Sequence, residues 1–209
     1  MPPVEELGIT LAAFLLGLQA TAYGGLLFWI GRKETSVLLS SVACLDIAAA
    51  SILFGVLTGW GESLELPKTL WPVTVFLIAY LGFFLATSTA QASIRNPARK
   101  GVQIALFIKF LIALAYLATR TVIQFQDVIW DYVTALVIIC GLKAYSKFGR
   151  NDKTSNWILS GVAISFFALP MLAANFYSNI WFNHMTVFLF LQMVALHCFY
   201  TGAKYKKDI

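Results

Sequence analysis

The sequence predicts an all-α polytopic membrane protein, a bundle of seven transmembrane helices. Composition is the first observation: 59% of the 209 residues are hydrophobic, 12% are charged, and the mean hydropathy is +0.77. Soluble domains carry about 25% charged residues, and a soluble chain of this size could not bury so much apolar surface. Seven long apolar segments and basic charge in alternate connections are the second and third observations.

Each apolar segment has roughly the 20 residues that a helix needs to cross the hydrocarbon core of a bilayer. The predicted helices are 7–30, 36–58, 70–92, 101–119, 127–146, 156–178 and 184–203. The fourth could continue through Thr119 and Arg120 to about residue 124. Short polar connections separate the segments, so one seven-helix domain is expected to fill residues 1–209.

Basic residues collect in the connections after the first, third and fifth segments and in the C-terminal tail. These twelve residues are Arg32, Lys33, Arg95, Arg99, Lys100, Lys143, Lys147, Arg150, Lys153, Lys204, Lys206 and Lys207. The opposite side has only Lys68 and Arg120. Because basic loops stay in the cytoplasm, the N-terminus is predicted outside and the C-terminus in the cytoplasm, in a bacterial inner membrane. The net charge of +5 then needs no nucleic-acid partner.

Two ionisable residues, Asp46 and Lys109, fall near the middle of predicted helices. A charge at the bilayer centre is costly, so such residues usually face the bundle interior and pair. Three interpretations stay open. Asp46 and Lys109 form an ion pair, Lys109 extends toward the cytoplasmic headgroups while Asp46 is hydrogen-bonded separately, or the residues serve a small receptor or transporter.

The last segment, FNHMTVFLFLQMVALHCFYTGA, resembles the last helix of uncharacterised bacterial seven-helix membrane proteins related to the CREST superfamily, which includes alkaline ceramidases and adiponectin-receptor-like proteins. The shared positions are Phe182, Asn183, His184, Gln192, Met193, Val194, Ala195, Leu196, Gly202 and Ala203. The resemblance implies a zinc-dependent hydrolase in which histidines one turn apart hold the metal. Zinc lowers the pKa of its bound water, and the resulting hydroxide attacks an amide or ester.

The metal-ligand set implied by this resemblance is largely missing. Phe188 and Leu189 occupy the positions where a second histidine would stand one turn after His184. The other histidine, His197, lies 13 residues further along, which is ~20 Å along a helix and about 220° around it. The two histidines therefore cannot share a metal ion.

We therefore expect a non-catalytic accessory or binding subunit on a degenerate hydrolase scaffold, a pseudoenzyme with no cofactor. Its partners would be membrane lipids, a hydrophobic ligand or other membrane subunits. The expected pocket residues are Asn183, His184, Phe188, Gln192 and Ser51. The alternative is a zinc-dependent lipid amide or ester hydrolase with its site at the outer rim. That site would use His184, Glu62 and Ser51.

Overall fold

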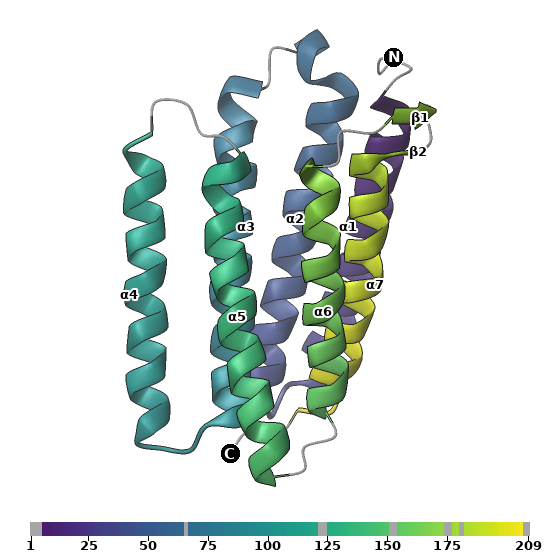
Figure 1. Cartoon of the computed structure of the whole chain (residues 1–209). Helices are drawn as coiled ribbons and strands as arrows, with labels where there is room; N and C mark the ends of the chain where they lie inside the picture. The colour runs from purple at the N-terminus through teal and green to yellow at the C-terminus, as the bar shows by residue number, and fades with distance from the viewer. Residues whose placement is uncertain are drawn as a thin grey trace.

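The computed structural model describes residues 6–64, 67–120, 125–150, 154–173, 177–179 and 182–206. Within these ranges the chain forms seven α-helices that run alternately up and down (Figure 1). They are α1 Leu7–Ile30, α2 Thr35–Leu64, α3 Pro67–Ser93, α4 Ala98–Ala118, α5 Phe125–Arg150, α6 Thr154–Ala173 and α7 His184–Lys204. All seven are long and apolar enough to cross a membrane. The predicted fold class, an all-α seven-helix membrane protein, is confirmed.

Some predicted helix boundaries were wrong. α2 continues past residue 58 to Leu64, and α4 ends at Ala118 because Thr119 and Arg120 have left the helix. α6 was predicted to reach residue 178 but ends at Ala173. The strand β1 Tyr177–Asn179 follows it and pairs antiparallel with β2 Phe182–Asn183. Hydropathy measures apolar character and does not distinguish a helix from a strand over so short a segment.

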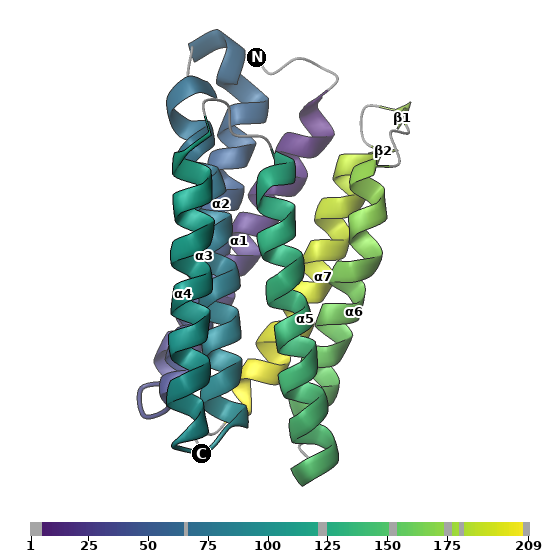
Figure 2. The ribbon, with the colours of Figure 1, turned by 60° about the vertical axis from the view of Figure 1, so that its left-hand side comes forward.

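Six of the seven helices form a closed ring, and α4 lies outside it. In the ring α1 contacts α2, α2 contacts α3, α3 contacts α5, α5 contacts α6, and α6 contacts α7, which returns to α1. α4 packs mainly on α3 at the edge of the bundle (Figures 1 and 2). Large apolar side chains of α4 are exposed and available to lipid, among them Ile104, Phe107, Ile108, Leu111 and Ile112.

α1 begins and α7 ends at opposite ends of the bundle (Figure 1). We name these the outer end, where α1 begins, and the inner end, where α7 ends, after the orientation that the loop charges predict. The membrane sidedness itself stays a prediction.

Glycines let α1 and α2 approach closely. A Cβ added at Gly24 would lie 2.8 Å from the Cγ and Cδ2 atoms of Leu45 and 3.3 Å from its backbone nitrogen. About two turns earlier on α1, a Cβ added at Gly17 would lie 2.8 Å from Cγ1 of Ile52. The Ser41 hydroxyl on α2 also donates a 2.8 Å hydrogen bond to the Gly24 carbonyl. Small residues of this kind are the usual means of close helix packing in membranes.

We predict opposite effects for alanine at two adjacent glycines of α1. Gly24→Ala should lower the free energy of unfolding by about 1–3 kcal/mol, because the new methyl group overpacks the contact with Leu45. Gly25→Ala should raise it by about 0.5–1 kcal/mol, because its Cβ would meet nothing within 4 Å and alanine favours the helix. Thermal unfolding of detergent-purified protein measures both. Equal effects of the two changes would contradict the packing described here.

Candidate functional site

A cavity of about 230 Å³ lies inside the six-helix ring. We call it the chamber. Among the described residues, its wall comes from α1, α2, α3, α5, α6 and α7. The lining runs along α3 from Trp71 to Leu85 and along α7 from Met185 to Phe199. At 1.5 Å per residue each stretch is roughly 21 Å long. The chamber is therefore elongated along the helix axes.

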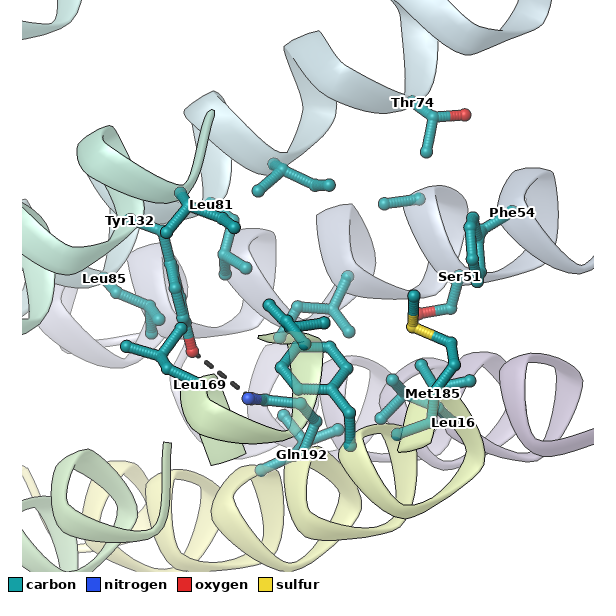
Figure 3. A pocket seen from close by; sticks show the side chains of 18 of the residues that line it. Leu16, Ser51, Phe54, Thr74, Leu81, Leu85, Tyr132, Leu169, Met185 and Gln192 are labelled. Atoms are coloured by element: carbon teal, nitrogen blue, oxygen red, sulfur yellow. Dashed lines mark hydrogen bonds between the residues drawn. The ribbon is translucent and has the colours of Figure 1, made fainter. Parts of the chain in front are cut away.

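The chamber wall is almost wholly apolar. The polar residues among those that line it are Ser51, Thr74, Tyr132 and Gln192. The Thr74 hydroxyl donates to the Leu70 carbonyl of its own helix at 3.0 Å, so its hydrogen is already engaged. Ser51, on α2, is drawn beside Met185 in Figure 3. The wall therefore offers a long hydrophobic surface with a few isolated polar groups.

Tyr132 and Gln192 form the polar contact in the chamber (Figure 3). The Tyr132 hydroxyl on α5 donates toward Oε1 of Gln192 on α7 at 3.3 Å and lies 3.2 Å from the Ser165 hydroxyl oxygen on α6. Nε2 of Gln192 is buried and has no hydrogen-bond partner among the described residues. Side chains of three helices thus meet at the Gln192 amide. Its oxygen accepts a hydrogen bond, and its nitrogen has no partner among the described residues.

The expected pocket residues separate into two groups. Ser51, Phe188 and Gln192 line the chamber, whereas Asn183 and His184 are not among the described residues that line it. Asn183 is the N-cap of α7: its Oδ1 accepts hydrogen bonds from the Thr186 backbone nitrogen at 2.9 Å and the Thr186 hydroxyl at 3.1 Å. This corrects the interpretation of Asn183 as a pocket residue, because its buried carboxamide is used to begin a helix.

The two histidines of α7 lie 13 residues apart and do not belong to one site. His184 begins the helix. Nδ1 of His197 lies 2.8 Å from the Tyr23 hydroxyl on α1, and the Tyr23 ring stacks on Tyr200 with centroids 4.1 Å apart. In the part of the chain that the structure describes, no group of three His, Cys, Asp or Glu could hold a metal ion. The side chain of Glu62, the carboxylate of the hydrolase alternative, lies outside the described residues.

Lys109 pairs with Asp131, so the proposed pair of Lys109 and Asp46 is wrong. The Lys109 ammonium on α4 lies 2.6 Å from Oδ1 of Asp131 and donates to the Asp131 backbone carbonyl at 3.1 Å. The interpretation that Lys109 extends to the cytoplasmic headgroups is also wrong, because Asp131 lies near the outer end of α5. Oδ2 of Asp46 is buried without a hydrogen-bond partner among the described residues. The structure therefore does not bring Lys109 and Asp46 together, as a transport path through both residues would need.

The model of a family of unknown function (DUF6962) matches residues 9–208. The chain belongs to the DUF6962 family. No curated protein and no solved structure matches the chain. The match includes all seven helices apart from the first residues of α1, so the whole chamber of this DUF6962 protein lies within the family region.

A buried lysine closes the inner end of the DUF6962 bundle. Lys206, predicted as a cytoplasmic basic residue, is 5% exposed and donates hydrogen bonds to the Ser88 hydroxyl at 2.7 Å and the Ser40 hydroxyl at 3.1 Å. A small space beside Lys206, of about 10 Å³, shares lining residues such as Leu85 and Phe199 with the chamber. It has room for roughly one water molecule. The inner end of the chamber is therefore narrow and polar.

Most chamber residues of the DUF6962 protein were not identified from the sequence, although a signal was present. The lining residues of α7 recur every three or four positions, as on one helix face. They are Met185, Phe188, Leu189, Gln192, Leu196 and Phe199. Those of α3 do the same, at Trp71, Thr74, Ile78, Leu81 and Leu85. Which faces meet is a property of the tertiary fold, and Tyr132 could not have been assigned without it.

We predict that Lys109 and Asp131 are energetically coupled in their contribution to stability. Lys109→Met should lower the free energy of unfolding by about 3 kcal/mol, because it leaves the Asp131 carboxylate buried and unpaired. The double change Lys109→Met with Asp131→Leu should restore most of that loss, since both charges of the pair are then removed together. A double-mutant cycle from thermal unfolding measures the coupling. Additive losses from the two single changes would contradict the pair.

Proposed function

We propose that this protein binds the hydrocarbon chain of a lipid-like molecule in its chamber and acts as a non-catalytic binding or accessory subunit. The observation that carries the proposal is the chamber itself, an elongated space of about 230 Å³ with an almost wholly apolar wall. Its narrow inner end and its length along the helix axes suit a narrow chain inserted parallel to the membrane lipids.

The volume lies in the range of apolar cavities that bind small molecules. An apolar cavity of about 150 Å³ in a protein core stays free of water and binds benzene, and the chamber exceeds it. Leaving a space of this size empty is costly, because its lining atoms lose van der Waals contacts. A bound chain restores those contacts. Burial of its own surface adds about 25 cal/mol per Å² of apolar area.

The hydrolase alternative has one supporting observation, the resemblance of α7 to a metal-site helix of CREST-like proteins. Ser51 lines the chamber, as a serine near a hydrolytic site would. Phe188 and Leu189 also line it, at the positions where that alternative needs a second histidine. The non-catalytic proposal is supported by these two apolar side chains, since they contact a ligand chain and cannot bind a metal.

We predict saturable binding of dibromo-octadecane to the purified protein in nanodiscs. Bromine quenches tryptophan fluorescence on contact, and Trp71 lines the chamber. The saturable part of the quenching should disappear in Trp71→Phe, because the exposed Trp29, Trp130 and Trp157 report only unsaturable partition into lipid.

A chamber-filling variant and a matched control make this test specific. Ala50→Phe places a ring inside the chamber and should abolish saturable quenching. Ala105→Phe adds the same ring at an exposed position of α4 and should leave it unchanged. Thermal unfolding checks that both variants are folded. Saturable quenching that survives Ala50→Phe in a folded protein would overturn the chain-binding proposal.

Metal analysis tests the hydrolase alternative. We expect no stoichiometric zinc in protein purified without chelators, and the same metal content in His184→Ala, because Phe188 and Leu189 offer no second ligand. One zinc ion per chain, lost in His184→Ala, would instead establish a metal site and reverse the choice between the two functions.

A further inference from the structure

Gln192 places a hydrogen-bond donor that has no partner among the described residues inside a largely apolar chamber. We infer that the ligand is a neutral long-chain lipid with a carbonyl group within its chain, and that the Gln192 amide Nε2 donates to that carbonyl oxygen. This inference rests on the chain-binding function proposed above and names the chemistry that selects among chains.

The glutamine amide is held from one side. The Tyr132 hydroxyl is the donor toward both Oε1 of Gln192 and the Ser165 hydroxyl oxygen, so its single hydrogen is shared between them. This contact directs the amide oxygen toward α5 and α6 and leaves Nε2, which is buried and without a partner among the described residues, for another acceptor. A buried amide donor without an acceptor raises the free energy of the empty protein. A ligand oxygen at this point removes that penalty.

The depth of Gln192 in the membrane narrows the class of ligand. It lies eight residues after His184, where α7 begins, which is ~12 Å along the helix from the outer end. The ester groups of a phospholipid stay at the membrane surface, so a phospholipid tail in the chamber would bring only methylene groups to Gln192. An oxygen at this depth belongs to a molecule that lies wholly within the hydrocarbon region.

The neighbouring groups favour a carbonyl over a hydroxyl. A carbonyl oxygen only accepts hydrogen bonds, as Nε2 requires. An alcohol would also bring a donor that needs an acceptor, and Oε1 of Gln192 has only the lone pair that the Tyr132 hydroxyl leaves free. The rest of the wall near α7, including Phe188, Leu189 and Leu196, is apolar and suits the chain on either side of the carbonyl.

Competition with dibromo-octadecane tests the inference, with heptadecane and its mid-chain ketone as the probes. We expect the ketone to displace the brominated chain from the native protein at about tenfold lower concentration than heptadecane does, the effect of roughly one buried hydrogen bond. Gln192→Leu should remove the difference in potency between the ketone and heptadecane.

A glutamine outside the chamber provides the matched control. Nε2 of Gln103 on α4 donates to Oε1 of Gln91 on α3 at 3.0 Å, so Gln103→Leu also removes one hydrogen bond between side-chain amides of two helices. The ketone preference should persist in this variant. Heptadecane binding reports that the chamber of each variant is intact, which separates a lost contact from a lost fold.

The outcomes separate the two proposals. If heptadecane binds saturably but the ketone shows no preference, the carbonyl inference fails while chain binding stands; this is also the result if a water molecule already satisfies Nε2. A preference that persists in Gln192→Leu overturns the role of Gln192. If neither probe displaces the brominated chain, both the chain-binding function and the inference fail.

Discussion

The constraint on which this structure depends is that lipid offers no hydrogen bonds, so every polar group in the membrane must find its partner within the protein. Several hydroxyls do so on their own helix, as Ser40 does with the Ser36 carbonyl at 3.0 Å and Thr89 with the Leu85 carbonyl at 2.8 Å. Others link helices, as Ser41 does with Gly24. Nε2 of Gln192 departs from this rule, as do Oδ2 of Asp46 and Oε1 of Gln19, because these buried atoms have no hydrogen-bond partner among the described residues.

The chamber also follows from how the helices pair. Glycines bring two pairs of helices into close contact, α1 with α2 at Gly17 and Gly24, and α6 with α7 at Gly161 and Gly202. A Cβ at Gly202 would lie 2.5 Å from Cγ1 of Ile158. Larger side chains line the centre, so neighbouring helices touch closely while a cavity stays open in the middle of the ring. Tight contacts between neighbours and an open centre are two consequences of the same distribution of small and large residues.

The fold could be predicted from the sequence because crossing a bilayer imposes a length and a hydropathy that single segments display. The site could be predicted only in part. Ser51, Phe188 and Gln192 line one chamber, and their role in binding a ligand stays a prediction. Asn183 carries a capping pattern, an asparagine three residues before Thr186, that was interpreted as ligand chemistry. The partner of Lys109 was missed because the structure brings the Asp131 carboxylate from α5 to α4, and a contact between two helices cannot be read from either segment alone.

The peripheral position of α4 has a consequence for how the protein is made. Lys109 precedes Asp131 by 22 residues, so a ribosome delivers α4 to the membrane before the carboxylate that neutralises it exists. A lone lysine at a helix centre opposes insertion by about 2.5–3.5 kcal/mol, and α4 has little burial elsewhere in the bundle to offset this. The ion pair can therefore form only after α5 has followed α4 into the bilayer.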